Sequence, residues 1–271
     1  MTETSSISGQ MPEITLCDTH THLWYDKFDH DRNRIIDDIK NGKIKYIIDV
    51  GTNLFDSEMA LNNTKKAENI FASVGIHPHD SEDVPPGYLE ILKDFLTEDK
   101  VVAIGEIGLD YFRNLSPREV QKKVFIEQIS LAKKLKKPII VHVRDAYDDA
   151  YQILKEHSGG IKGVIHSFSS NYEYAKKFIS LGFKLGIGGP ITYKKNEELR
   201  ETVKKIDLKY LLCETDCPYL PPVPFRGKRN EPEYVEYTIL KISEIKDIDS
   251  KMVSETLCKN GNSLFNLNLE V

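Results

Sequence analysis

The chain has 271 residues, with 37 Lys and Arg against 42 Asp and Glu, which gives a formal net charge of −5. This balance argues against a histone-like protein that holds nucleic acid through bulk positive charge, but it leaves open a nuclease that binds phosphate through metal ions. Hydrophobic residues make up 40% of the chain. No apolar stretch approaches the roughly 18 residues of a membrane-spanning helix, so we expect an apolar core and no membrane span.

The first residues, MTETSSISGQMP, lack the basic and apolar regions of a secretory signal. We therefore expect a disordered lead at residues 1–12, a single domain over residues 13–271, and a cytoplasmic protein. The four cysteines, Cys17, Cys213, Cys217 and Cys258, are few for this length. Without a secretion signal, the default expectation is reduced thiols packed in the interior.

Eight short runs rich in β-branched residues follow one another along the chain. They cover residues 14–20, 45–51, 69–77, 101–109, 138–143, 163–168, 183–189 and 210–216. Most of them show little alternation of apolar and polar residues, which is typical of parallel strands buried on both faces. Amphipathic segments lie between these runs, so the sequence predicts a repeated strand–helix unit.

The clearest helical pattern begins at Ser116. Ser116 is expected to cap this helix, Pro117 suits the first helical position, and Glu119 completes a capping box. Apolar residues then recur at helical spacing as far as Leu135, and Pro138 opens the next strand. Eight such units in about 250 residues predict a (β/α)8 TIM barrel. A doubly wound open sheet is the alternative, because the alternation alone does not separate the two.

Side chains that can bind a metal ion gather at the carboxyl ends of the predicted strands. They are His20, His22, His77, Glu106, His142, His166, Glu214 and Asp216. In a barrel these strand ends meet at one mouth, where active sites form. A single histidine there is more often a packing residue, and His30, His79 and His157 are interpreted in this way. The whole set would be costly to bury without a metal or a substrate, so it predicts a metal centre.

The ligand types indicate which metals the centre would bind. Imidazole and carboxylate groups without thiolate suit Zn, Mn, Mg or Fe. Six or more ligands exceed one tetrahedral site, so we expect two divalent ions, with Mg, Mn or Zn as candidates. Two ions about 3.5–4 Å apart stabilise the attacking and leaving oxygens of an in-line phosphoryl displacement.

Six blocks of the sequence resemble the TatD-type metal-dependent deoxyribonucleases of the amidohydrolase-like barrel group. The blocks are DTHTHL (18–23), VGIHPH (74–79), AIGEIGLDYF (103–112), PIIVHVRDA (138–146), GVIHSFS (163–169) and ETDCPYLPPVPFRGKRNEP (214–232). They occur in family order and the resemblance covers almost the whole chain. It implies a divalent-metal hydrolase that acts on DNA, often as a 3′→5′ exonuclease.

The resemblance also implies roles for single residues. By the family pattern Glu106 bridges two metal ions. The remaining ligands divide into His20, His22 and Asp216 for one ion, and His142 and His166 for the other. His77 and Glu214 match positions beside the metals that are implicated in substrate contacts or in indirect contacts to the ligands.

The expected reaction is hydrolysis of DNA phosphodiester bonds by a water that the two metal ions activate, with Glu106, Asp216 and Glu214 as catalytic residues. Glu214 is preferred for orienting the water, since Asp216 is expected to be a ligand. The substrate is expected to be single-stranded DNA or a strand end. Its contacts are assigned to His77, Arg113, Arg226 and Arg229. Tyr111, Phe112, Tyr219 and Phe225 either stack on an end base or pack within their loops.

Three other functions remain as alternatives. A D-aminoacyl-tRNA deacylase or another metal-dependent ester hydrolase needs the same activated water. A C–N hydrolase of the wider superfamily is disfavoured, because many of those bridge their metals with a modified lysine where this chain has Glu106. A non-catalytic nucleic-acid-binding module would need a basic face that the scattered lysines do not offer. A monomer without an obligatory protein partner is the default expectation.

Overall fold

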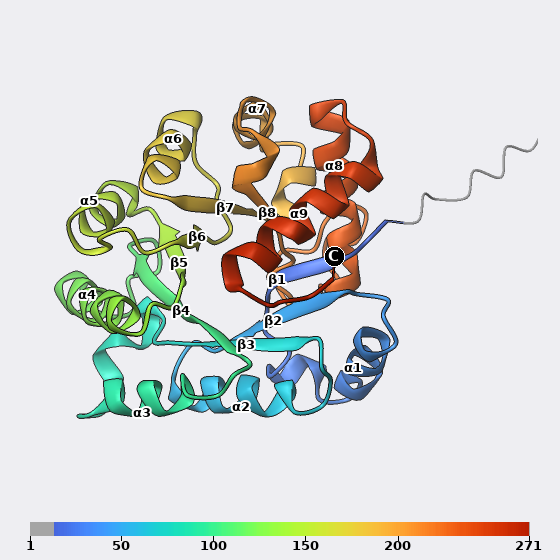
Figure 1. Ribbon diagram of the computed structural model, residues 1–271. Coiled ribbons are helices and arrows are strands. Elements are labelled where there is room, and N and C mark those ends of the chain that lie inside the picture. The colour runs from blue at the N-terminus through green and yellow to red at the C-terminus, as the bar shows by residue number, and fades with distance from the viewer. Residues whose placement is uncertain (1–13, 271) are drawn as a thin grey trace, which may run out of the picture.

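Eight parallel strands form a single sheet in the order β1 to β8 (Figure 1). The computed structural model describes residues 14–270, so the expected disordered lead lies outside the described residues. The strands are β1 (Cys17–Thr21), β2 (Tyr46–Val50), β3 (Ile70–Val74), β4 (Val101–Asp110), β5 (Ile139–Arg144), β6 (Gly163–Ile165), β7 (Phe183–Ile187) and β8 (Leu211–Cys213). A bridge between Thr21 and Cys217 brings the first strand beside the last. The chain is therefore a (β/α)8 barrel, and the open-sheet alternative is wrong.

Helices surround the strands and separate them along the chain (Figure 1). They are α1 (Arg32–Lys40), α2 (Leu54–Thr64), α3 (Tyr88–Phe95), α4 (Arg118–Leu135), α5 (Tyr147–His157), α6 (Tyr172–Ser180), α7 (Glu197–Lys205), α8 (Val235–Lys246) and α9 (Ser250–Phe265). Short 3-10 turns complete the connections, among them η2 (Pro78–Asp83) after β3. None of the helices in residues 14–270 is long and apolar enough to cross a membrane.

The strands are buried along almost their whole length, as their runs of β-branched residues predict. Their ends differ from the predicted ends in a way that matters for the site. β6 stops at Ile165 and β8 at Cys213, so His166, Glu214 and Asp216 lie in the loops that follow. β4 ends at Asp110, one residue beyond the predicted run, so Glu106 lies within the strand as expected. The predicted runs for β6 and β8 included the polar residues that follow them, and these residues lie in the loops where the barrel opens.

The predicted capping box at the start of α4 is wrong. Pro117 is the N-cap residue, and no side chain caps the helix. The Ser116 hydroxyl instead donates to the backbone oxygen of His79 at 2.8 Å and accepts from the backbone nitrogen of Glu82 at 3.1 Å. The capping signal therefore marks a contact between two loops at the barrel mouth.

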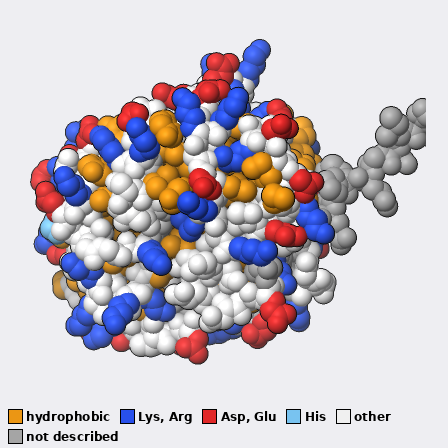
Figure 2. All heavy atoms as spheres, turned by 45° about the horizontal axis from the view of Figure 1, so that its top comes forward, with side chains coloured by type: hydrophobic (Ala, Val, Ile, Leu, Met, Phe, Trp, Pro, Cys, Tyr) orange, Lys and Arg blue, Asp and Glu red, His pale blue; other side chains and the backbone are white. Residues whose placement is uncertain are grey.

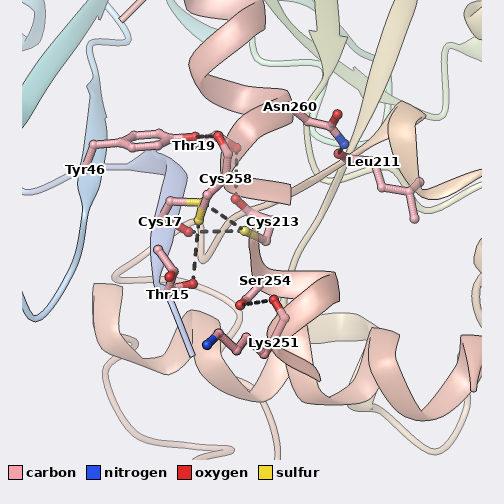
Figure 3. The surroundings of a disulfide bond; sticks show 10 residues. All are labelled: Thr15, Cys17, Thr19, Tyr46, Leu211, Cys213, Lys251, Ser254, Cys258 and Asn260. Atoms are coloured by element: carbon pink, nitrogen blue, oxygen red, sulfur yellow. Dashed lines mark hydrogen bonds between the residues drawn. A yellow bond between two sulfur atoms is a disulfide. The ribbon is translucent and has the colours of Figure 1, made fainter. Parts of the chain in front are cut away.

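The expectation that all four cysteines are reduced is also wrong, because Cys17 and Cys258 form a disulfide (Figure 3). β1 and α9 bring their Cα atoms to 5.6 Å, within the range that a disulfide spans. Cys213 and Cys217 are free and buried. The absence of a secretion signal does not report which cysteines lie close together. Cys17 and Cys258 meet because α9 packs against β1 and β8.

Candidate metal centre

All six predicted metal ligands meet at the carboxyl end of the barrel. They are His20, His22, Glu106, His142, His166 and Asp216, and they lie within three groups of donor atoms that could each hold an ion, one of which also includes His77. Segments far apart in the sequence supply these side chains, since β1, β4 and β5 carry one each and the loops after β1, β6 and β8 carry the other three. The closed order of the strands therefore places the donor atoms around one point.

Glu106 lies between the two halves of this cluster. Its Oε2 atom is 3.4 Å from His20 Nε2 and 3.9 Å from His22 Nε2. Its Oε1 atom is 2.7 Å from His142 Nδ1 and 3.8 Å from His166 Nε2. Each carboxylate oxygen thus faces a different group of histidines. This is the arrangement that a carboxylate shared by two ions requires.

Asp216 completes the half of the cluster that contains His22. Its Oδ1 atom is 3.3 Å from His22 Nε2 and 3.9 Å from His20 Nε2. The backbone nitrogen of Asp216 donates to the backbone oxygen of His20 at 2.9 Å, which fixes the loop after β8 against β1. Asp216 has a left-handed φ of +59°, a conformation that few residues other than glycine adopt and that is common at functional sites.

In each of three histidines, the contact of one ring nitrogen with a neighbouring group fixes which nitrogen faces the cluster. His22 Nδ1 is 2.8 Å from the backbone oxygen of Val50, an atom that only accepts, so Nδ1 carries the proton and Nε2 offers a lone pair. His166 Nδ1 faces the carboxylate of Glu214 at 2.9 Å, which likewise leaves its Nε2 toward the cluster. His142 is turned the other way, because its Nε2 lies 3.3 Å from Asp110 and its Nδ1 faces Glu106. His22 and His166 therefore turn Nε2 toward the centre, and His142 turns Nδ1 toward it, where that atom donates to Glu106 Oε1 at 2.7 Å.

His77 has the opposite arrangement. Its Nδ1 accepts a hydrogen bond from the backbone nitrogen of His79 at 3.1 Å, so the proton of the neutral ring lies on Nε2. That Nε2 atom faces Glu106 Oε1 at 3.8 Å. Burial holds the pKa of His77 well below its usual range, which keeps the ring neutral. His77 is thus set to donate a hydrogen bond into the site.

The buried carboxyl group of Glu214 contacts His166 at the base of the site. Its Oε1 atom also accepts from the backbone nitrogen of Ser167 at 2.6 Å. Gly186 makes this position available, because a Cβ atom there would lie 2.2 Å from Glu214 Oε2. Glu214 is 1% exposed, so the water that the sequence analysis assigned to it has little access to this carboxylate.

The charges of the cluster depend on one another. Burial alone would raise the pKa of Glu106, but its interactions with the surrounding histidines, including a hydrogen bond with His142, outweigh burial and hold that pKa well below the usual range. Burial would lower the pKa of His166, but Glu214, Glu106 and Asp216 raise it to about 10. The carboxylates thus remain ionised and attract positive charge to the site.

The residues present fit a divalent metal. The donors are buried imidazole nitrogens and carboxylate oxygens, which suit Zn, Mn and Mg. His20 Nε2 and His22 Nε2 lie 3.2 Å apart, and the rings of His20 and His166 are stacked with their centroids 3.4 Å apart. A cation between these groups would neutralise the carboxylates. It would also accept lone pairs from the histidine nitrogens that face the cluster.

Two carboxylates that the sequence analysis did not assign support this cluster. Asp110 Oδ2 contacts both His142 Nε2 and His79 Nε2, the latter at 2.9 Å. Asp18 Oδ1 accepts from the backbone nitrogens of His20, at 3.1 Å, and Thr215, at 2.9 Å. Both lie inside the sequence blocks that carry the family resemblance, and this place in the blocks was the available signal.

The predicted phosphate contacts occupy different environments. Arg113 is exposed, and its backbone nitrogen donates to Asp110 at 2.7 Å. Arg226 is exposed and lies over the ring of Tyr193, with 3.9 Å between its guanidinium carbon and the ring centroid. Arg229 instead pairs with two carboxylates of the protein, Asp31 at 2.6 Å and Glu231 at 2.9 Å. The face shown in Figure 2 mixes basic and acidic side chains, in keeping with the net charge of −5.

The fold and this cluster are those of a (β/α)8-barrel hydrolase that depends on a metal. Comparison with known proteins gives the family: residues 17–266 match the family described as TatD related DNase. The chain belongs to this family. It is 40% identical over 254 residues to the uncharacterized metal-dependent hydrolase YabD of Bacillus subtilis, a match that covers 93% of this chain and 100% of YabD.

Solved structures agree with this assignment. YjjV, a TatD homolog from Escherichia coli, superimposes with a TM-score of 0.86 at 32% identity, over 93% of this chain and 98% of YjjV. A TatD family hydrolase from Entamoeba histolytica gives a TM-score of 0.83 at 25% identity, over 93% of this chain and 98% of that protein. A dihydroorotase at 14% identity, with a TM-score of 0.61, shares the fold. The predicted family, fold and metal-dependent hydrolase class are therefore confirmed.

Proposed function

We propose that the protein hydrolyses phosphodiester bonds of DNA at a strand end, from 3′ to 5′, with the help of two divalent metal ions. The observation that carries the proposal is the position of Glu106, whose two oxygens face separate groups of histidines. The family description, TatD related DNase, supports DNA as the substrate. A bridged pair of ions is the arrangement that stabilises both the attacking and the leaving oxygen of a phosphoryl transfer.

The residues that would hold the ions follow from the contacts of Glu106. His20, His22 and Asp216 would hold one ion with Glu106, and His142 and His166 would hold the other. When bound, divalent ions polarise the phosphoryl group and lower the pKa of water, which supplies the nucleophile at neutral pH. The protein contributes neighbouring groups, among them Glu214 and Asp110, that orient these ligands.

Side chains around the cluster take the remaining steps. Asp216 is more exposed than Glu214, at 15% against 1% of the side chain, so it is better placed to accept a proton from the attacking water. Glu214 holds the ring of His166. The Nε2 proton of His77 is available to a non-bridging phosphate oxygen. Arg113 and Arg226 extend into solvent, where they can meet the neighbouring phosphates.

A metal-dependence assay on a defined substrate tests the proposal. Purified protein is incubated with a single-stranded oligonucleotide labelled at its 5′ end, so that removal of nucleotides from the 3′ end gives a ladder. We expect activity to disappear in chelator and to return with Mg or Mn. Activity that resists the chelator, or immediate release of the labelled 5′ nucleotide without a ladder, would contradict the proposal.

Two further arms separate DNA hydrolysis from the alternatives. Glu106→Gln keeps the size of the side chain but removes the charge between the ions, and we expect loss of turnover with a folded protein. A D-aminoacyl-tRNA is assayed beside the oligonucleotide under the same conditions. Hydrolysis of the aminoacyl ester without cleavage of DNA would replace the proposed function by a deacylase.

A further inference from the structure

Large apolar side chains are exposed mainly around the barrel mouth. Of the eight that are exposed among residues 14–270, six lie in the segments that follow β2, β4 or β8. These six are Phe55, Phe112, Leu115, Tyr219, Leu220 and Val223. Exposed apolar surface that gathers around a polar site indicates contact with a ligand that has apolar faces.

Phe112 lies beside the half of the metal cluster that contains His142. It follows β4 by two residues and is 59% exposed. The guanidinium of Arg144 covers one face of its ring, with the guanidinium carbon 3.9 Å from the ring centroid. Arg144 ends β5 two residues after His142 and pairs with Asp110 across the sheet. The guanidinium thus covers one side of the ring while much of the ring surface stays open.

Tyr219 lies beside the other half of the cluster. It is 41% exposed, and its ring centroid is 6.2 Å from that of His22. Its backbone nitrogen donates to the backbone oxygen of Asp216 at 2.8 Å, which ties it to a candidate ligand. Tyr25 packs edge-on at 5.7 Å, and Lys27 Nζ lies 5.3 Å from the ring centroid. Tyr219 therefore repeats the arrangement of Phe112, with an aromatic ring supported by a cation.

The two rings lie on opposite sides of the mouth. Phe112 belongs to the β4–β5 side and Tyr219 to the β8–β1 side, and two strands separate these pairs in each direction around the closed barrel. Figure 1 shows β4 and β5 on one side of the barrel and β8 and β1 toward the other. Glu106, which contacts both halves of the cluster, lies between them.

The other two aromatic residues of these loops are already engaged within the protein. The Tyr111 hydroxyl donates to Asp149 at 2.6 Å, and the guanidinium of Arg118 covers its ring. Phe225 stacks face to face on Tyr234, with their centroids 4.0 Å apart. Of the four aromatic residues that the sequence suggested for stacking, Phe112 and Tyr219 are the two with a large exposed surface.

We propose that Phe112 and Tyr219 each stack on one of the two bases that flank the scissile phosphate, so that the substrate is an unstacked single strand of at least two nucleotides. This inference rests on the proposed function and names its substrate class. Stacking on an aromatic ring tolerates every base, since each has a π-face. Two bases held on opposite sides of one phosphate cannot stack on each other, so a paired duplex interior is excluded.

The inference separates nucleic-acid strands from small phosphate esters. A mononucleotide or an aminoacyl ester offers a base on one side of the reacting bond, so it contacts one ring at most. A dinucleotide is the smallest substrate that contacts both. A binding measurement without cleavage can therefore test whether the protein prefers a strand with two bases to a ligand with one.

The experiment measures binding and cleavage separately. The probe is a single-stranded pentanucleotide with phosphorothioate linkages, which slow hydrolysis, and with 2-aminopurine at one of the two central positions, where stacking quenches fluorescence. We expect quenching with the wild-type protein. Phe112→Ala and Tyr219→Ala are each expected to weaken binding by about 5- to 150-fold, the range for loss of one stacked base.

Matched variants show whether the effect is stacking. Phe112→Trp and Tyr219→Phe keep an aromatic ring and should bind within about threefold of wild type. Met252→Ala removes an equally exposed apolar side chain on α9, away from the mouth, and should have no effect. An abasic residue on one side of the central phosphate should weaken binding to the wild type but not to the alanine variant that lacks the ring on that side. An abasic residue on the other side should have the same relation to the other variant.

The possible results distinguish this inference from the proposed function. Quenching that both alanine variants abolish, without cleavage of an unmodified strand, would retain the two stacking rings and contradict the nuclease. Cleavage of DNA with alanine variants that bind within twofold of wild type would retain the nuclease and overturn the stacking rings. Equal binding of duplex and single strand would also overturn them.

Discussion

Glu214 lies 2.9 Å from Nδ1 of His166 and turns the Nε2 atom of that ring toward the candidate metal centre. Both side chains are almost completely buried, so water does not compete for the contact. Carboxylates that hold a ligating histidine in this way fix its tautomer and increase its basicity. We therefore expect Glu214 to act on the chemistry through His166 rather than through a water molecule.

Replacing Glu214 should weaken metal binding more than it weakens the fold. We expect Glu214→Gln, which keeps the shape of the side chain, to lower the affinity for Mn or Zn by about 10- to 100-fold. Calorimetric titration of metal into the metal-free protein measures this. Glu119→Gln, at a side chain that is 85% exposed on α4, is the matched control. Equal affinities for the two variants would contradict the role of Glu214.

Gly186 provides the space that Glu214 occupies. A Cβ atom at this position would meet the carboxylate at 2.2 Å, and both groups are buried in the barrel. We expect Gly186→Ala to destabilise the protein by about 1–3 kcal/mol, as overpacking does, and to weaken metal binding as well. Gly188→Ala is the control, since its nearest neighbour would lie at 3.5 Å. Urea unfolding of the three proteins compares them, and equal midpoints for both variants would refute the steric argument.

Much of the site could be predicted because a parallel barrel converts a position in the sequence into a position in space. Every strand end reaches the same mouth, so His20 and His166 could be placed together although 146 residues separate them. The sequence does not show which group each histidine ring contacts through the nitrogen that faces away from the cluster. The backbone oxygen of Val50 sets the tautomer of His22, and a backbone nitrogen in the turn after β3 sets that of His77.

The loops explain what could not be predicted. Arg229 is predicted to contact the substrate because it follows the last ligand block, and the sequence does not show that its guanidinium also pairs with Asp31. Ser116 carries the signal of a helix cap, yet its hydroxyl joins two loops instead. In both cases the partner residue comes from a segment distant in the sequence. Patterns among neighbouring residues therefore do not predict the contact.

Asp110 should control the orientation of His142. It accepts from the ring at 3.3 Å, and the backbone nitrogen of Arg113 holds its other oxygen at 2.7 Å. Asp110→Ala removes this contact, and we expect loss of about 10- to 100-fold in affinity at the half of the centre that contains His142. Titration of metal should then give two separate binding events where the wild type gives closer affinities. Unchanged binding in Asp110→Ala would show that Glu106 alone orients the ring.

Arg229 and Asp31 should contribute to stability in a way that depends on pH. The guanidinium of Arg229 holds the pKa of Asp31 below its usual range. A carboxyl with a lowered pKa in the folded state stabilises the protein above its unfolded pKa of about 3.9 and loses this contribution as the pH falls through the folded value. The free energy of unfolding of the wild type should therefore decrease more between pH 6 and pH 3 than that of Arg229→Gln.

The same variant tests the phosphate contact that the sequence predicted for Arg229. The residue joins the loop after β8 to Asp31, immediately before α1, through two short contacts of 2.6 Å, so the ion pair must break before the guanidinium can meet a phosphate. If the role is structural, Arg229→Gln lowers the unfolding midpoint in urea at pH 7 and leaves the salt dependence of KM unchanged. Arg226→Gln removes an exposed guanidinium from the same loop and should raise KM at low salt. A flatter salt dependence of KM in Arg229→Gln, with unaltered stability, would assign the residue to the substrate.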